Sequence, residues 1–279
     1  MHRPLGTNDP FRDLETWDEH TARFWMEALE QRAVAADQRR VRTRLIQLAG
    51  VRTGDTVIEV GCGTGALLAD LTHAVRPGGH AIGIEPQPAF AEAARQRLLR
   101  EGLAAEAEVR TARAEHLDLP KAQAAACLAQ TVFIHLPADA LHQTLAAMVQ
   151  AVRPGGRVLS VDQDGDTWVI DHPERELTRR IVRFNGDQRY ADGWRGRQLR
   201  RLFLEAGLVH VAVHCWVHSD TNASSYLFGM AERLALAASE AGVVDKEEAI
   251  RWIHELRDLA AQGHFFSSMN YYACVGVRA

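Results

Sequence analysis

Residues 55–65 read DTVIEVGCGTG, and the last glycine opens the helical pattern GALLADLTHAV at 65–75. An apolar strand that runs into closely spaced glycines and then into a helix is typical of a loop that binds a nucleotide-like ligand. Glycines let the backbone approach such a ligand, and the free N–H groups at the start of a helix favour negative charge. We therefore predict a binding loop at Gly61, Gly63 and Gly65.

A regular alternation of strand and helix patterns surrounds this loop. Two helical patterns fill residues 19–49 before the first strand, and apolar runs alternate with helical runs after it. Each pair of parallel strands needs a crossover connection, so the alternation predicts helices on both faces of a parallel sheet. We predict an α/β fold with a doubly wound, mostly parallel, seven-stranded sheet and helical cap insertions. The expected strands are 55–60, 80–85, 105–112, 124–130, 157–162, 208–217 and 265–277, and the helices after the loop are 65–75, 88–102, 138–152, 195–207, 224–241 and 246–262.

Four segments divide the chain. An N-terminal helical lid covers residues 1–50, and a cofactor-binding core covers 51–164. The alternation breaks after Asp162 at a polar segment, which we interpret as a cap insertion over 165–194. The part from 195 to 279 returns to the core and includes a helical insertion at 221–262.

The composition excludes several classes of protein. The 279 residues carry a formal net charge of −4 and the sequence pI is near 6.4, so nucleic acid is not an expected partner. No apolar run approaches the roughly 20 residues of a membrane span, and the start MHRPLGTNDP lacks the apolar core of a signal peptide. The four cysteines lie far apart without zinc-type spacing. We predict a cytoplasmic protein with no membrane partner and no metal, and a homodimer is compatible with the sequence.

The glycine loop alone does not select its ligand, because residues 61–66 also fit the nicotinamide fingerprint GxGxx[GA]. Glu59, two residues before the first glycine, occupies a strand position where a dinucleotide-binding enzyme normally has a small or apolar residue. A buried carboxylate is costly unless it is paired, which suits a zwitterionic sulfonium ligand better than a pyrophosphate. Glu85 ends the next strand and can accept the ribose hydroxyls of either cofactor. Glu59 therefore favours the sulfonium cofactor.

The ordered strings EVGCGTG, GIEPQ, ARAEHLDLP, QTVFIHLP and AVRPGGRVLSVD resemble the class I methyltransferases that act on small molecules, a family that includes quinone and natural-product enzymes. The resemblance covers residues 50–162 closely and extends weakly to RGRQLRRLFLEAGL. It implies S-adenosylmethionine as the cofactor. The contacts that it implies are to the methionine part for Glu59, Gly61, Gly63 and Gly65, to the ribose for Glu85, to the adenine for Pro86, and to the far side of the cofactor for Gln130.

One segment departs from the family pattern. In ARAEHLDLP the family usually has an aspartate before the alanine, where it accepts a hydrogen bond from the adenine amino group, and this chain has Arg113. A guanidinium group has no acceptor atom. We expect the backbone N–H of Ala114 and the carboxylate of Glu115 to serve adenine instead.

Two residues at the carboxyl ends of strands are catalytic candidates. Methyl transfer is a displacement that depends on positioning, and a base is needed only where the nucleophile holds a proton of high pKa. His135 follows the fourth strand and can act as a general base at neutral pH. Asp162, at the end of the fifth strand, can orient an amine or accept a hydrogen bond from a hydroxyl. The alternatives are packing for His135 and turn capping for Asp162, and His218 and Asp220 rank after both.

Aromatic and histidine side chains gather in the predicted caps. An aromatic lining suits a flat organic acceptor and keeps water away from the sulfonium, although tryptophans also anchor helices to sheets. His142 and His172 are interpreted as surface residues. The predicted substrate-binding residues are Trp17, His20, Trp168, Tyr190, Trp194 and Tyr226.

The sequence thus predicts an enzyme that methylates an oxygen, nitrogen or activated carbon of a small aromatic metabolite. Two other functions stay open. A nicotinamide-dependent oxidoreductase would use the same glycine fingerprint, and a non-catalytic scaffold protein could keep the loop, for which Arg113 is the only hint.

Overall fold

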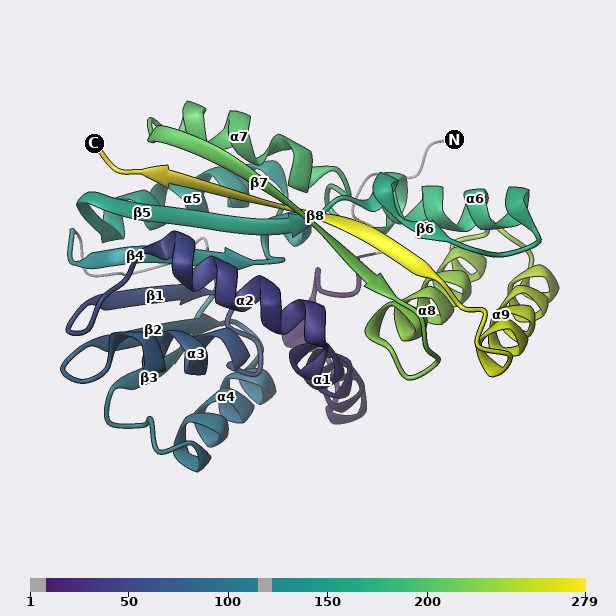
Figure 1. Ribbon diagram of the computed structural model, residues 1–279, viewed down its shortest axis with the longest axis horizontal. Helices are drawn as coiled ribbons and strands as arrows, with labels where there is room; N and C mark the ends of the chain where they lie inside the picture. Colours follow the sequence, from purple (N-terminus) through teal and green to yellow (C-terminus); the bar gives the residue numbers. More distant parts are fainter. Residues whose placement is uncertain (1–8, 115–121) are drawn as a thin grey trace.

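The first strand after the N-terminal helices, β1 (Thr56–Val60), is buried from Val57 onward, which places it in the middle of the sheet. The computed structural model describes residues 9–114 and 122–279 (Figure 1). Its sheet has the strand order β3-β2-β1-β4-β5-β8-β6. The eighth strand, β7, is not in this order and pairs with β8. The other strands are β2 (His80–Glu85), β3 (Ala107–Thr111), β4 (Ala124–Gln130), β5 (Val152–Gln163), β6 (Val169–Ile170), β7 (Val209–Asp220) and β8 (Ser267–Val277).

Strands β1 to β5 run parallel to one another. Strand β8 runs antiparallel to β5, β6 and β7. The predicted doubly wound, mostly parallel, seven-stranded sheet is therefore confirmed, with the two-residue strand β6 added in the cap. The fifth strand, expected over 157–162, begins earlier in the structure, so the RPGG segment at 153–156 belongs to β5. Gly155 N–H donates to the carbonyl of Arg278 at 2.8 Å, and Arg278 N–H donates to Gly156 at 2.9 Å, so the end of the chain extends the pairing.

Helices cover both faces of the sheet because side chains alternate along each buried strand. Val57 belongs to the apolar cluster that includes the helices of one face, and Ile58 belongs to the cluster of the other face. Figure 1 shows the two layers on either side of the strands. The first face carries α2 (Ala36–Ala49), α3 (Ala66–Val75) and α4 (Pro88–Arg100), and the second carries α5 (Ala138–Ala151) and α7 (Arg195–Glu205).

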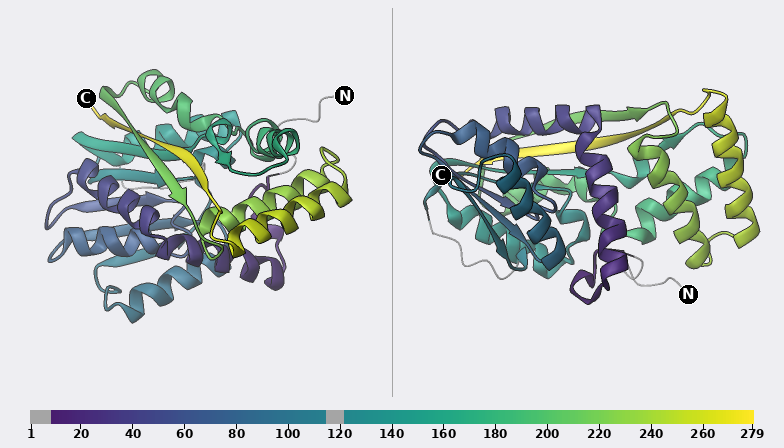
Figure 2. Two further views of the ribbon diagram at one scale, coloured as in Figure 1. Left: turned by 45° about the vertical axis from the view of Figure 1, so that its right-hand side comes forward. Right: turned by 90° about the horizontal axis from the view of Figure 1, so that it is seen from below.

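The cap lies beyond the carboxyl ends of the central strands. Strands β7 and β8 continue past the sheet to reach it, as both views of Figure 2 show. Its helices are α1 (Glu19–Val34), α6 (Arg175–Phe184), α8 (Tyr226–Glu240) and α9 (Lys246–Ala261). The start of α9 is fixed by a capping box between Asp245 and Glu248, a pair that satisfies backbone N–H groups left over at a helix start.

A buried tryptophan ties the cap helices together. Trp252 of α9 is fully buried and donates from Nε1 to Oγ1 of Thr178 in α6 at 2.9 Å. The ring of His172 stacks on Trp252 with 4.8 Å between centroids. The expectation that His172 lies at the surface is wrong, because its side chain is fully buried in this contact.

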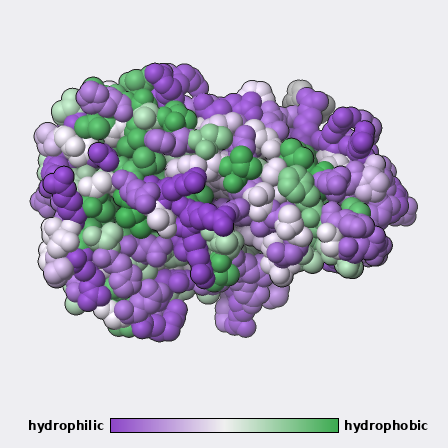
Figure 3. Space-filling view, viewed as in Figure 1, coloured by the Kyte–Doolittle hydropathy of each residue, from purple (hydrophilic) through white to green (hydrophobic). Residues whose placement is uncertain are grey.

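The surface is mostly hydrophilic on the face of Figure 1, with apolar groups in separate patches (Figure 3). Val209, Val213 and Val217 of β7 are among the exposed apolar side chains. Within residues 9–114 and 122–279, no helix combines the length and the apolar character needed to cross a bilayer.

Candidate functional site

The glycine loop after β1 has a backbone that side chains would disturb. Gly61, Gly63 and Gly65 all have positive φ, at 68°, 54° and 82°. A Cβ at Gly61 would collide with a methyl group of Val132, and one at Gly65 would lie 2.9 Å from the Cβ of Ala94. Both conformation and close approach therefore require glycine in this loop.

Glu85, at the end of β2, is held against the glycine loop. One carboxylate oxygen, Oε2, accepts the backbone N–H of Gly63 at 2.8 Å, and Oε1 accepts that of Gln87 at 2.9 Å. Burial raises the pKa of Glu85 to about 7, against the lowering effect of these two N–H donors. The carboxylate oxygens keep lone pairs for further donors such as ligand hydroxyls.

Glu59, on β1, is buried and only partly compensated. Its Oε2 has no hydrogen-bond partner within the described part of the chain. Burial raises its pKa well above the usual range, and the positive charges of Arg42 and Arg32 act in the opposite direction. An unpaired buried carboxylate oxygen needs a donor, preferably a cationic one.

A cavity of about 430 Å³ opens at the carboxyl ends of β1, β2 and β4. It extends from the glycine loop into the cap, so that the core and the cap share its walls. Those walls come from the 3₁₀ turn Phe133–His135, the helices α1, α2 and α8, the π-helical turn Asn185–Arg189, and a part of the N-terminal segment before α1.

His135 lines the cavity and is held by an aspartate near the N-terminus. Its Nδ1 lies 2.9 Å from Oδ1 of Asp9, whose side chain is only 1% exposed. Asp9 also accepts the backbone N–H groups of Phe11 and Ala191. Because both oxygens of Asp9 serve as acceptors in these contacts, we assign the proton of the shared hydrogen bond to Nδ1 of His135. Nε2 of His135 is left as a proton acceptor without a partner among the described residues.

Asp162 does not occupy the position expected of a catalytic group. It lies inside β5, is fully buried, and is absent from the cavity wall. Its oxygens accept the backbone N–H of Ile134 at 3.2 Å and the hydroxyl of Ser160 at 3.0 Å. Burial raises the pKa of Asp162 to about 6. The carboxyl group therefore supports the turn that carries His135 and cannot reach an acceptor.

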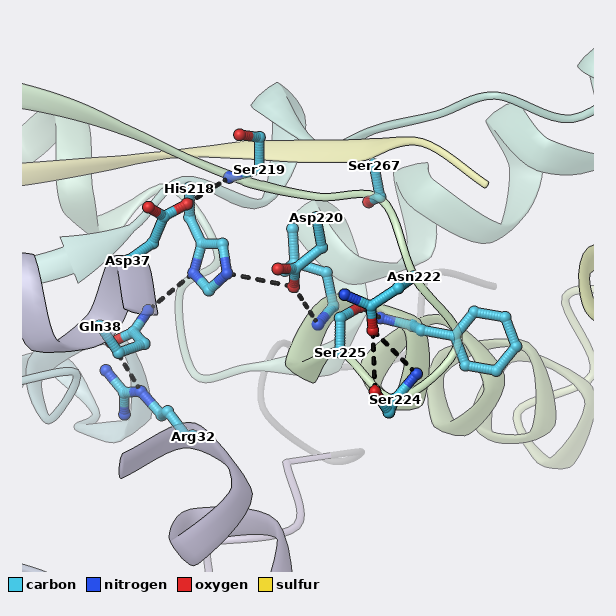
Figure 4. Close-up of polar contacts among 12 residues, drawn as sticks. Arg32, Asp37, Gln38, His218, Ser219, Asp220, Asn222, Ser224, Ser225 and Ser267 are labelled. Carbon is cyan, nitrogen blue, oxygen red and sulfur yellow. Dashed lines mark hydrogen bonds and ion pairs between the residues drawn. The ribbon is translucent and has the colours of Figure 1, made fainter. Parts of the chain in front are cut away.

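A chain of hydrogen bonds leads from the cavity wall to the start of α8 (Figure 4). Nε of Arg32 donates to Oε1 of Gln38 at 3.1 Å, and Nε2 of Gln38 lies 2.9 Å from Nδ1 of His218. Nε2 of His218 lies 3.1 Å from Asp220, which also accepts the N–H of Leu227. Because an amide nitrogen only donates, Nδ1 of His218 accepts and its Nε2 donates. This chain fixes the orientation of Arg32 in the cavity, where its Nη2 is buried without a partner.

Most of the predicted cofactor and acceptor residues line this one cavity. Gly65 is not in its wall and instead closes the loop against α4. Glu115 lies outside the described residues. The predicted residues in the wall are Glu59, Gly61, Gly63, Glu85, Pro86, Ala114, Gln130, His135, Trp168, Tyr190 and Tyr226.

Three predicted substrate-binding residues do not line the cavity. Trp17 packs beside it, with its ring 5.4 Å from that of Phe11. His20 is exposed on the first turn of α1. Trp194 is 42% exposed and lies under the guanidinium group of Arg197. Trp17 therefore stands behind the aromatic wall, whereas His20 and Trp194 face solvent.

The structure adds four charged residues that the sequence patterns did not indicate. Asp9 holds His135, and Arg32, Arg189 and Arg233 reach the cavity from three separate elements. The arginines stand in helical segments whose polar positions usually face solvent, so only the assembled fold distinguishes them. Arg113, the departure from the family pattern, also lines the cavity and donates to Glu15 at 2.6 Å.

Comparison with known proteins agrees with this site. A family model described as a methyltransferase domain matches residues 57–156, which contain the glycine loop and Glu85. A Streptomyces fradiae protein, described as an uncharacterized 37.1 kDa protein in transposon Tn4556, is 31% identical over 249 residues, covering 88% of this chain and 69% of that protein. The ubiquinone/menaquinone biosynthesis C-methyltransferase UbiE of Pseudomonas fluorescens is 32% identical over 119 residues, covering 42% of this chain and 45% of the enzyme.

The fold has solved counterparts as well. The YcgJ protein of Bacillus subtilis superposes with a TM-score of 0.59 at 15% identity, covering 85% of this chain and 97% of that chain. These matches do not favour the oxidoreductase or the scaffold protein. The methyltransferase-domain match, which contains the glycine loop and the acid that ends β2, and the similarity to UbiE lead to one family. The chain belongs to the class I S-adenosylmethionine-dependent methyltransferases that act on small molecules.

Proposed function

We propose that this chain transfers a methyl group from S-adenosylmethionine to an oxygen, nitrogen or activated carbon of a small aromatic acceptor, with His135 as the general base. The observation that carries the proposal is a single cavity that holds different polar groups at its two ends. The unpaired oxygen of Glu59 lies at the glycine loop, and the His135–Asp9 pair lies beside the aromatic wall.

The buried groups at the glycine loop fit the cofactor. Its methionine part carries an ammonium and a carboxylate group. In the described part of the chain, Glu59 Oε2 lacks a donor and Arg32 Nη2 lacks an acceptor. The Glu59 oxygen can accept from the ammonium group, and the Arg32 nitrogen can donate to the carboxylate. Glu85 has spare lone pairs for the ribose hydroxyls, and Pro86 and Ala114 line the part of the wall proposed for adenine.

His135 is equipped to take a proton from an acceptor hydroxyl or amine. When bound, the cofactor supplies an electrophilic methyl group, whose bonding electrons stay on sulfur as the acceptor's lone pair forms the new bond. The proton that the acceptor loses passes to Nε2 of His135. The negative charge of Asp9 then stabilises the imidazolium through Nδ1. An activated carbon acceptor would need the same base only where its proton is retained at neutral pH.

The acceptor half of the cavity has flat walls. Trp168, Tyr190, Tyr226 and Phe11 supply rings to its lining, and Tyr190 lies edge-on to His135 with 5.3 Å between centroids. Aromatic walls bury the faces of a flat ligand and exclude water from the reacting atoms. The similarity to a quinone-biosynthesis methyltransferase is consistent with an aromatic acceptor.

The proposal is tested in two stages. Calorimetry with S-adenosylmethionine and S-adenosylhomocysteine should give saturable binding to the wild-type chain. A screen of aromatic alcohols, amines and enols with mass detection should then reveal a gain of one methylene unit. Absence of binding by either cofactor form at millimolar concentration would overturn the proposed activity.

A further inference from the structure

The cavity wall opposite the glycine loop carries two arginines without an acidic partner. Arg189 of the π-helical turn is only 9% exposed, and Arg233 of α8 is partly buried. Within residues 9–114 and 122–279 neither forms an ion pair or a hydrogen bond. Burial lowers the pKa of Arg233, and the nearby positive charge of Arg189 lowers it further. Arg233 lies over the ring of Trp25, with 6.0 Å to its centroid, and the charge of Glu232 raises its pKa. Among the described residues, however, neither arginine is paired directly with an acid.

Two other shielded arginines of this chain are paired with acids. Arg42 meets Asp70 at 2.7 Å, and Arg97 meets Glu30 at 2.7 Å. Two acids that stand close to these arginines in the chain are engaged elsewhere, since Glu232 accepts from Arg257 and Asp187 accepts from Arg183. A shielded cation without an acidic partner is unfavourable, so two of them side by side in a cavity wall indicate that a ligand completes the site.

Asn185 adds a neutral donor to the same wall. It is fully buried, lines the cavity, and neither its Oδ1 nor its Nδ2 has a partner in the described structure. The turn that carries it packs tightly, because a Cβ on Gly165 would lie 2.7 Å from Cα of Gly186. π-helical turns of this kind occur frequently at functional sites.

We infer that the methyl acceptor carries an anionic carboxylate or phosphate group, which Arg189 and Arg233 bind together while Asn185 donates from Nδ2. This inference rests on the proposed methyl transfer. The only carboxylates in the cavity wall, Asp13, Glu59 and Glu85, come from the N-terminal segment and the cofactor end, so no acid of the wall competes for the two arginines. Planar guanidinium groups match the geometry of both oxyanions.

The anchor also sets the direction of the acceptor. The anion would be held between α8 and the turn Asn185–Arg189, and the aromatic body would extend past Tyr190 toward His135. The nucleophilic atom then faces the glycine loop, where the methyl group is delivered. An uncharged acceptor of the same shape would leave the two cations unpaired and should bind poorly.

The test uses the full chain saturated with S-adenosylhomocysteine and four small probes. Benzoate and phenyl phosphate represent the two anion sources, and benzamide and benzyl alcohol are their neutral counterparts. Binding is measured by calorimetry for the wild type, Arg189→Gln, Arg233→Gln and the surface control Arg179→Gln, whose ion pair is with Glu176 on the same helix. Far-ultraviolet circular dichroism and S-adenosylhomocysteine affinity report on folding.

The inference predicts that at least one anion binds the wild type, and that each cavity variant weakens it about ten- to a hundredfold. Arg179→Gln should leave the affinity within twofold of the wild type. A preference for benzoate or for phenyl phosphate identifies the oxyanion. The inference is overturned if neither anion binds the loaded protein, if the neutral probes bind equally well, or if the variants lose S-adenosylhomocysteine instead. Failure of the wild type to bind S-adenosylhomocysteine would refute the proposed methyl transfer.

Discussion

Oδ1 of Asp9 lies 2.9 Å from Nδ1 of His135, although 126 positions separate the two residues in the chain. The contact brings the segment before α1 onto the turn after β4, at the edge of the cavity. It gives a histidine that lines the cavity a fixed tautomer and a buried counter-charge. The N-terminal segment is therefore part of the cavity wall.

Replacing Asp9 should impair turnover without impairing cofactor binding. Asp9→Asn removes the charge that stabilises the imidazolium, and we expect kcat to fall about tenfold or more with an acceptor that must lose a proton. His135→Ala should cost about a hundredfold or more. Steady-state kinetics with the acceptor found by the mass screen measures both. The exposed His142→Ala is the control, and full turnover by the His135 variant would remove the histidine from the mechanism.

Neutralising Glu59 should weaken cofactor binding and leave the fold intact. Glu59→Gln keeps the size of the side chain but replaces a charge-assisted hydrogen bond to the ammonium group by a neutral one. We expect S-adenosylhomocysteine affinity to drop about tenfold or more in calorimetry. The exposed Glu92→Gln on α4 serves as the matched control. Equal affinity of Glu59→Gln and wild type would assign Glu59 to the core alone.

Cofactor affinity should rise with pH because of Glu85. Its pKa of about 7 in the unliganded chain means that near pH 6 most molecules hold a proton there. Ribose hydroxyls donate best to the ionised form, so binding releases that proton, and affinity for S-adenosylhomocysteine should increase about tenfold from pH 6 to pH 8.

The same titration with Glu85→Gln separates this group from others. The variant has no proton to release at this position, so the increase between pH 6 and pH 8 should be lost or greatly reduced. An equally steep increase in the variant would assign the pH dependence to another group, such as Glu59.

The free energy of unfolding should depend on pH because of Asp162. Its pKa is about 6 in the folded chain and 3.8 ordinarily, so the folded state holds the proton more tightly. The stabilising contribution is full below about pH 4 and is lost as pH rises through about 6. Asp162→Asn removes this dependence while keeping partners for Ile134 and Ser160.

Urea unfolding at several pH values tests that expectation. The wild type should lose stability relative to Asp162→Asn as the pH rises. The unfolding free energy of the variant minus that of the wild type should increase by on the order of 1 kcal/mol between pH 5 and pH 8. A difference that stays constant over this range, or that shrinks, would contradict a raised pKa for Asp162.

The sequence predicted the core well because its cues are local. The apolar run before Gly61 and the glycines themselves specify a strand and a loop through short-range sterics, and Glu85 follows from its place at the next strand end. Aromatic residues in the caps were predicted less well. Trp168 and Tyr226 line the cavity, whereas Trp194 faces outward, because side-chain direction there depends on how the cap docks.

The charged residues of the acceptor half could not be predicted. Arg189 and Arg233 lie 44 positions apart on different elements, and nothing in either segment distinguishes them from solvated arginines. Their significance depends on the absence of nearby free acids, which only the folded arrangement reveals. Asp162 is absent from the cavity wall because the last residues of β5 stay paired with β8 inside the sheet.

Helix α8, which lines the cavity, and helix α9, which packs against α8, have neighbouring attachment points. Asp220, at the end of β7, faces Ser267, at the start of β8, across an antiparallel pair, and α8 and α9 lie between them in the chain. The helical pair therefore forms a cassette between these two points, and we expect its replacement to keep the strand pairing and the glycine loop where the new helices fill the place of Trp252 against Thr178 and His172. Grafting a different cassette between residues 220 and 267 offers a route to new acceptors on an unaltered cofactor-binding half.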